Sequence, residues 1–84
     1  MKLNILRPTG TIYSGDADMV TVPGKGGELA ILPGHAALTT ILKEGVITVK
    51  HGEKVFQFAI DRGSMNVKDG GVFILVHEIK EHTP

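Results

Sequence analysis

Glycine divides this 84-residue chain into short segments. Eleven glycines occur, and most intervals between their clusters are 7 to 11 residues long. They lie at Gly10, Gly15, Gly24, Gly26, Gly27, Gly34, Gly45, Gly52, Gly63, Gly70 and Gly71. This spacing of turn residues is typical of an all-β sandwich or barrel, in which short strands alternate with tight turns. The chain is therefore predicted to consist of many short strands.

Between the glycines, apolar and polar side chains alternate with a period of two, which places them on opposite faces of a strand. The alternation is present in Lys2–Leu6, Asp18–Val22, Val46–His51 and Lys54–Ile60. In the first of these segments, Leu3 and Ile5 share one face. Val72–Val76 is apolar at every position, which predicts a strand covered on both faces.

Only one segment has a plausible helical turn, Ala36–Lys43, and its β-branched residues Thr39–Ile41 favour a strand instead. Leu32–His35 has proline and glycine at the two corners of a predicted turn. Asp69–Gly71 is a strong hairpin signal. We expect nine or ten strands, essentially no helix, and a polar end at His77–Pro84 that frays.

Length and charge limit the classes of function. A chain of 84 residues has room for one domain. Nine basic residues balance nine acidic ones, which argues against a general binder of nucleic acid or anionic membranes. The absence of cysteine excludes a disulfide scaffold and thiolate zinc sites. The apolar runs are too short for a membrane span, and the first twenty residues do not have the pattern of a signal peptide.

The segment Pro23–Gly27 suggests a phosphate loop, but it fails in detail. A P-loop needs Ser or Thr directly after the lysine and a glycine five residues before Gly24, and these positions hold Gly26 and Met19. A dinucleotide-binding loop would need glycine at Leu29 and a helix after it. We therefore interpret this segment as an exposed turn.

No pattern in the sequence indicates catalysis or a metal site. Neither Ser14 nor Ser64 lies in a nucleophile elbow, and Asp61 with Ser64 is an ordinary turn composition. The histidines do not have the i, i+2 or i, i+4 spacing that aims two imidazoles at one metal ion. They are His35, His51, His77 and His82. We expect no catalytic residue, no cofactor and no metal ligand.

Two further classes of function remain open from the residues alone. A small barrel that binds single-stranded nucleic acid would use stacking aromatics and a positive groove. The aromatic residues are Tyr13, Phe56, Phe58 and Phe73, and the three phenylalanines are predicted to be core. A ligand-binding or hydrolytic sandwich would need an apolar pocket with converging polar groups. Neutral charge counts against the first class, and the absence of motifs counts against the second.

The segment Gly26–Ile47, GGELAILPGHAALTTILKEGVI, closely resembles the amino-terminal domain of the epsilon subunit family of F-type ATP synthases. The L-P-G-H-A run at Leu32–Ala36 is its most specific part. Upstream, Tyr13–Gly15 and Val20–Gly24 are similar to the family's opening, and Val72–Val76 is similar to its last strands. The resemblance covers essentially the whole chain.

This resemblance implies a ten-stranded β-sandwich of two antiparallel sheets, with little or no helix. It implies a non-catalytic rotor subunit that binds the gamma subunit and the c-ring, so that proton-driven rotation is coupled to ATP synthesis. Such a subunit is peripheral on the cytoplasmic face of the bacterial inner membrane, or on the thylakoid membrane in a plastid. Nucleic acid and direct membrane insertion are not expected.

Site residues carried over from the family form three groups. The expected c-ring interface is Lys25, Gly26, Gly27 and Glu28. The expected gamma interface is His35, Leu38, Thr39 and Leu42, and the turn formers are Pro33 and Gly34. From the residues alone, the preferred interpretation of Glu28 is a solvated turn carboxylate, and His35 is a turn histidine bonded to nearby backbone. Core packing is the alternative for Leu38 and Leu42.

The chain departs from the family pattern at several positions. Ala30 and Ala37 replace a usual glycine and a common proline, and the S-G-G turn is Asp61–Gly63 here. Many members continue for about 40–50 residues into a helical hairpin of two short helices. We expect a domain over residues 1–78, a short polar tail over 79–84 and no hairpin in the chain as given. Whether that ending is natural is not decided by the sequence.

Overall fold

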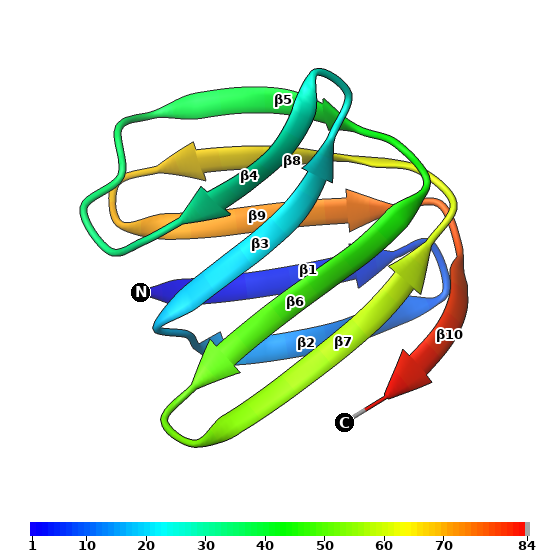
Figure 1. The fold of residues 1–84 in the computed structure, drawn as a ribbon, viewed down its shortest axis with the longest axis horizontal. Helices are drawn as coiled ribbons and strands as arrows, with labels where there is room; N and C mark the ends of the chain where they lie inside the picture. Colours follow the sequence, from blue (N-terminus) through cyan, green and yellow to red (C-terminus); the bar gives the residue numbers. More distant parts are fainter. Residues whose placement is uncertain (84) are drawn as a thin grey trace.

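The computed structural model describes the backbone of residues 1–83 and the side chains of residues 1–80. Strands occupy most of this range and no helix occurs in it, in agreement with the all-β expectation (Figure 1). None of the described residues forms a helix able to cross a membrane. The strands are β1 (Lys2–Arg7), β2 (Gly10–Asp16), β3 (Met19–Gly24), β4 (Gly27–Ile31), β5 (Leu38–Leu42), β6 (Gly45–His51), β7 (Lys54–Ile60), β8 (Gly63–Lys68), β9 (Gly71–Val76) and β10 (Ile79–Thr83).

The strands form one curled sheet whose two halves pack against each other. Their order is β10-β7-β6-β3-β5-β8-β9-β1-β2, and β4 pairs with β3 outside this path. One layer contains β3, β4, β6, β7 and β10, and the other contains β5, β8, β9, β1 and β2 (Figure 1). Only the pair Gly24 and Leu42 joins β3 to β5, so the sheet bends at this point.

The pairing pattern refines the expectation of two antiparallel sheets. The backbone ladder is continuous between the layers, and β1 pairs with β9 in parallel. The first strand lies between β2 and β9, which come later in the chain. All other strand pairs are antiparallel.

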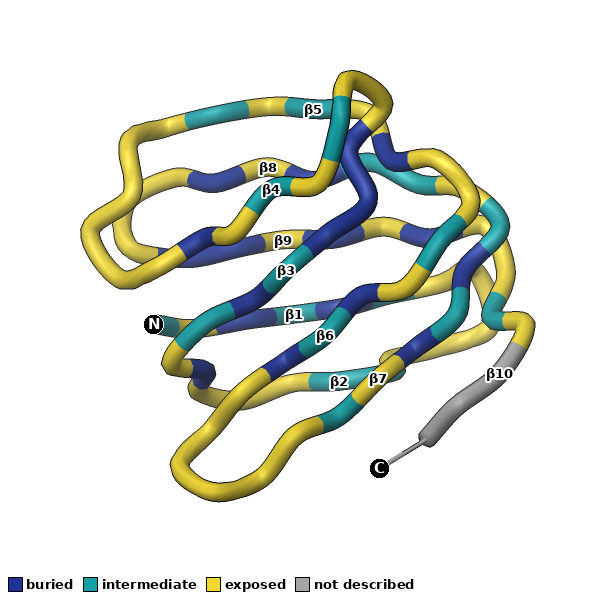
Figure 2. Tube along the Cα trace, in the orientation of Figure 1, coloured by how far each residue is buried: buried dark blue, intermediate teal, exposed yellow. Residues whose placement is uncertain are grey.

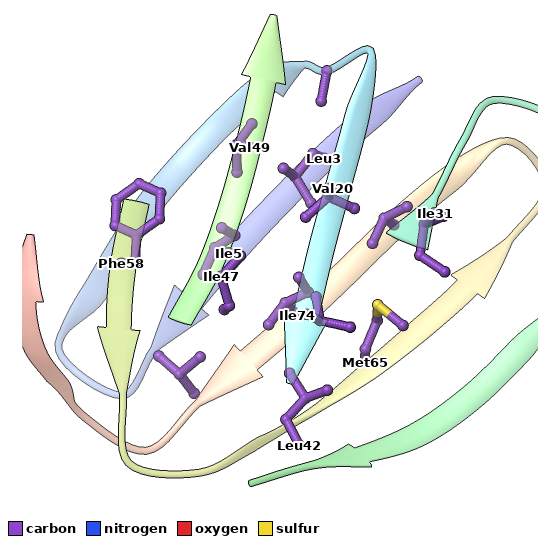
Figure 3. Packing of buried hydrophobic residues seen from close by; sticks show 14 of the residues in the cluster. Leu3, Ile5, Val20, Ile31, Leu42, Ile47, Val49, Phe58, Met65 and Ile74 are labelled. Carbon is purple, nitrogen blue, oxygen red and sulfur yellow. The ribbon is translucent and has the colours of Figure 1, made fainter. Parts of the chain in front are cut away.

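The core lies between the two layers and is entirely apolar among the described side chains (Figure 3). The period-two alternation predicted it well, because Leu3, Ile5, Val20 and Val22 are all fully buried. Each strand gives alternate residues to this core, so buried and exposed positions follow one another along the chain (Figure 2). The buried set is Leu3, Ile5, Ala17, Val20, Val22, Ile31, Leu42, Ile47, Val49, Phe58, Ile60, Met65, Val67, Val72, Ile74 and Val76.

One prediction for β9 was wrong. The continuous apolar run Val72–Val76 was expected to be covered on both faces, yet Phe73 is 49% exposed and Leu75 is 56% exposed. Phe73 is therefore not a core residue. The reason is the two-layer architecture, because β9 has a partner layer on its inner face only and its outward side chains meet solvent.

Both predicted turns are confirmed. The amide of His35 donates to the carbonyl of Leu32 at 3.1 Å, and Gly34 has φ of 85°, as a type II turn requires. Asp69 and Gly70 both have positive φ, at 49° and 77°, which is the type I′ geometry of a tight hairpin. The segment Ala36–Lys43 contains strand β5 and no helix, also as expected.

The polar end of the chain was expected to fray, but its residues 79–83 are paired in a strand. Residues Ile79–Thr83 form β10, which pairs with β7 at the edge of the sheet. Hydrogen bonds also hold the segment between β9 and β10, since the amide of His77 donates to the carbonyl of Arg62 at 3.0 Å and the amide of Asp61 donates to the carbonyl of Glu78 at 3.3 Å. The expectation that His77–Pro84 frays is therefore wrong for the strand residues 79–83, and Pro84 lies outside the described residues.

Candidate protein-interaction surfaces

The β3–β4 hairpin presents the acidic residue that the sequence singled out. Glu28 lies on β4, opposite Pro23 of β3, and its side chain is exposed. Lys25 and Gly26 form the two-residue turn between the paired Gly24 and Gly27. The segment is thus strand, turn and strand, without the helix that a phosphate loop requires. The interpretation as an exposed turn is confirmed for Lys25 and Gly26, whereas Pro23 and Gly24 are buried residues of β3.

This hairpin is held firmly to its neighbours. The amide of Lys25 donates to the carbonyl of Ile41 at 2.9 Å, and the amide of Lys43 donates to the carbonyl of Pro23 at 2.9 Å. A β-carbon on Gly45 would lie 2.6 Å from the Cβ of Pro23, so the backbones approach closely at the base of the hairpin. Glu28 is therefore carried by a fixed frame rather than by a loose loop.

The turn Leu32–His35 lies at the opposite end of β4 and β5 from this hairpin tip (Figure 1). His35 is exposed, and its Nδ1 lies 2.7 Å from the carbonyl oxygen of Ala36. Because a carbonyl oxygen only accepts, Nδ1 carries the hydrogen and Nε2 is left for another partner. The expected c-ring residues and the turn that carries His35 therefore lie at opposite ends of strand β4.

Strand β5 divides the expected gamma interface between two faces. Leu42 is 1% exposed and packs in the core, so its side chain contributes to no surface, and the core-packing alternative describes it. Leu38 is half-buried on the same inner side. Thr39 points outward, where its Oγ1 donates to Oδ1 of Asn66 on β8 at 3.3 Å. Of the four residues of the expected gamma interface, Thr39 and His35 are exposed.

Exposed apolar residues near Thr39 were missed by the sequence reasoning. Ile41, on β5 two residues after Thr39, is 56% exposed. Phe73 and Leu75 on β9 belong to the same layer. Their signal was present in the sequence, because a continuous apolar strand in a two-layer fold must place alternate side chains in solvent. The all-apolar run was instead interpreted as a doubly covered strand.

The described side chains hold no cluster of acidic and histidine residues suited to a metal ion. The Nδ1 of His77 lies 2.6 Å from Oδ2 of Asp61. The other oxygen of Asp61 accepts hydrogen bonds from the amides of Arg62 and Glu78. Desolvation alone would raise the pKa of Asp61, but the hydrogen bonds from His77 and the two amides lower it to about 2. The Asp61–His77 pair joins the connection between β7 and β8 to the connection between β9 and β10.

The sequence profile of the ATP synthase delta/epsilon chain β-sandwich domain matches residues 1–82 of this chain. The chain belongs to this family. The match includes β10 up to His82, in agreement with the pairing of that strand to β7.

Bacterial relatives in the family carry the name ATP synthase epsilon chain. The relative from Desulforamulus reducens is 42% identical over 74 residues, which is 88% of this chain and 56% of the relative. The relative from Campylobacter fetus is 41% identical over 75 residues, covering 88% of this chain and 58% of its own length. The chain thus spans little more than half the length of these curated relatives.

Two solved structures share the fold. A chain from the Euglena gracilis mitochondrial ATP synthase, in a structure of OSCP, F1 and the c-ring, matches with a TM-score of 0.86 and 29% identity. The match covers 92% of this chain and 50% of that one. A chain from the Tetrahymena thermophila mitochondrial ATP synthase central stalk and c-ring has a TM-score of 0.85, covering 96% and 66%. At 18% identity, the latter likeness concerns the fold alone.

Proposed function

We propose that this chain is the β-sandwich part of a rotor subunit of a proton-translocating F-type ATP synthase. In this role it catalyses nothing and links the gamma subunit to the c-ring, so that ring rotation is coupled to ATP synthesis. The observation that carries the proposal is the family match over residues 1–82, supported by relatives that are named epsilon chains. The bacterial sources of these relatives favour a position on the cytoplasmic face of the inner membrane.

The positions of the hairpin tip and of the Leu32–His35 turn, at opposite ends of β4, support two separate contacts. The hairpin tip, with Lys25 to Gly27 and the exposed Glu28, is the proposed c-ring contact. A loop of the ring that carries a hydrogen-bond donor or a cation would pair with the Glu28 carboxylate. His35 and Thr39 belong to the proposed gamma contact, with Pro33 and Gly34 setting the turn that positions His35.

Such a linker must be rigid, because torque applied at one contact has to reach the other contact without deforming the domain between them. A close-packed apolar core between two layers resists deformation. The described side chains leave no buried nitrogen or oxygen without a hydrogen-bond partner, which is consistent with a well-determined interior.

Sedimentation of the chain with a matched gamma subunit at physiological salt tests the proposal. We expect a stable one-to-one complex. The absence of a complex, with both proteins shown to be folded by circular dichroism, would contradict it. An unrelated β-sandwich of similar size serves as the negative control for nonspecific association.

A further inference from the structure

Every ion pair between described residues involves one short segment, His77–Lys80, which leads from β9 into β10. The pairs are His77 with Asp61 at 2.6 Å, Glu78 with Arg7 at 3.2 Å, and Lys80 with Glu44. The ionic attachments within the described part of the chain are therefore concentrated at the point where it enters β10. This segment, with its three pairs, is here called the clasp.

The partners of the clasp come from both layers of the sandwich. Arg7 ends β1, Glu44 lies between β5 and β6, and Asp61 lies between β7 and β8. The β5–β6 and β7–β8 connections each cross from one layer to the other (Figure 1). The clasp lies on a third crossing, from β9 to β10, so its ion pairs tie this crossing to the two others and to the end of β1.

Asp61 makes the largest number of bonds to the clasp and its surroundings. Its Oδ1 accepts hydrogen bonds from the amides of Arg62 at 2.7 Å and Glu78 at 2.9 Å, and its Oδ2 lies 2.6 Å from Nδ1 of His77. Desolvation would raise the pKa of Asp61, but the bonds to its carboxylate lower it to about 2. The surroundings of Asp61 thus favour the charged carboxylate.

The two edge strands of the sheet are attached in different ways. At one edge, β2 packs Ile12 and Tyr13 against the core, and the Tyr13 ring lies 5.6 Å from the ring of Phe56. At the other edge, β10 is hydrogen-bonded to β7 alone, and Ile79 is the single apolar residue in its sequence. Salt screens ion pairs between exposed side chains and does not screen apolar contacts. The attachment of β10, unlike that of β2, should therefore weaken as the ionic strength rises.

Ile79 joins β10 to the core without being enclosed by it. Its side chain is half-buried and packs against the buried cluster. It also lines a cavity of about 190 Å³ together with Arg7, Thr11, Ile12 and Phe58. A side chain beside a cavity has fewer neighbouring atoms to lose than one packed on all sides. The fully buried residues themselves all precede β10, so the core can stay in place when this strand leaves.

We propose that the clasp lets β10 open and close as one unit while β1 to β9 stay folded. The structure described above is the closed form. Loss of the three ion pairs would leave β10 attached through its ladder to β7 and the contact of Ile79. The open form would expose the edge of β7 and widen the cavity beside Phe58. The clasp thus makes the exposure of an unpaired strand edge depend on ionic strength.

Native-state hydrogen exchange of the unmodified chain, followed by NMR at neutral pH, tests the proposal. We expect the amides of β10 to exchange through a local opening, with protection about tenfold below that of amides in β1 and β6. Raising NaCl from about 50 to about 500 mM should lower the protection of β10 about threefold. The amides of β2 are the internal control, because this strand forms the other edge and should show no comparable loss.

Variants assign the effect to the ion pairs. Asp61→Asn keeps an oxygen that accepts from backbone amides but loses the charge beside His77, and it should lower β10 protection about fivefold. Glu44→Gln changes an exposed turn side chain and should lower it about twofold. Both should reduce the effect of salt, and Glu44→Gln decides the test if Asp61→Asn does not fold.

Glu53→Gln is the matched control for the loss of one exposed carboxylate. Glu53 lies between β6 and β7 and has no ion pair among the described residues. Its exchange pattern should equal that of the wild type, and thermal melts verify folding of all three variants. The measurement does not involve the gamma subunit, so its outcome is independent of the proposed function.

Three results would overturn the proposal. In the first, β10 amides exchange only with global unfolding, as the core amides do, so the strand does not open by itself. In the second, salt lowers protection equally in β2 and β10, so the effect is not specific to the clasp. In the third, β10 opens locally but the folded Asp61→Asn and Glu44→Gln variants exchange as the wild type does, so the ion pairs do not hold it.

Discussion

Gly63 lies directly against the backbone of Leu75, where a β-carbon on Gly63 would be 2.3 Å from the carbonyl oxygen of Leu75. Gly63 is paired on both sides, with Leu42 of β5 and Val76 of β9, so neither neighbour can retreat without breaking a strand ladder. We predict that Gly63→Ala destabilises the fold by about 1–3 kcal/mol, the usual cost of overpacking a close contact.

Urea denaturation measures this effect, with Gly26→Ala as the matched control. A β-carbon on Gly26 would have no atom within 4 Å, and the backbone there has no positive φ. The control should change the free energy of unfolding by less than about 0.5 kcal/mol. Equal effects of the two substitutions would show that the close approach at Gly63 does not limit stability.

Asp61 makes the stability of the fold dependent on pH in the acidic range. Its pKa is lowered from 3.8 to about 2, where the hydrogen bonds from His77 and from the amides of Arg62 and Glu78 outweigh desolvation. A carboxyl group whose pKa is lower in the folded state stabilises the fold above its unfolded-state pKa. This contribution is lost as the pH falls from about 4 through about 2.

Asp61→Ala is therefore predicted to reduce the urea midpoint at pH 7 and to differ less from the wild type at pH 2. Glu53→Ala is the control for loss of one exposed carboxylate, because Glu53 has no recorded bond among the described residues. A carboxyl-carbon titration by NMR that places the Asp61 pKa near its ordinary value would refute the stated cause.

Leu42 and Thr39, three residues apart on β5, are predicted to have opposite phenotypes. Leu42→Ala should cost about 2–5 kcal/mol of stability, because it leaves a cavity in the core at a side chain only 1% exposed. Thr39→Ala should cost under about 0.5 kcal/mol and should weaken gamma binding instead. Thermal melts and a binding titration on the same samples separate the two. A large loss of stability in Thr39→Ala would place its hydroxyl in a structural role.

Glu28→Gln is predicted to leave the melting temperature within a degree or two, since the exposed side chain has no bond to lose within the described chain. In an assembled ATP synthase it should reduce proton-coupled ATP synthesis through the proposed c-ring contact. Lys54→Gln, on the distant β6–β7 hairpin, is the matched control. Unchanged coupling in Glu28→Gln would remove this residue from the contact.

The sequence patterns succeeded where one local rule decided the outcome. The alternation that put Leu3 and Ile5 on one face needs only the period of a strand, and the turn at Pro33 and Gly34 needs only the dihedral preferences of proline and glycine. The β-branched residues of β5 likewise predicted a strand from local sterics.

The patterns failed where the answer depended on distant neighbours. Val72–Val76 looks doubly buried from composition, yet only the arrangement of the layers leaves Phe73 and Leu75 in solvent. His77 seemed part of a fraying end because its partner Asp61 lies sixteen residues away in the chain. The alternation in β5 placed Leu42 on one face of the strand. Only the tertiary structure showed that this face meets the core.

The sequence by itself determined the strands, most of the core, the main turns and the family, because each follows from local periodicity, turn chemistry or a specific motif. The tertiary structure alone decided the parallel pairing of β1 with β9, the pairing of β10 with β7 and the exposure of the outward side chains of β5 and β9. The physical reason is that a strand's own residues specify its two faces, whereas the strands beside it and the layer opposite it, which are distant in sequence, determine which face meets water.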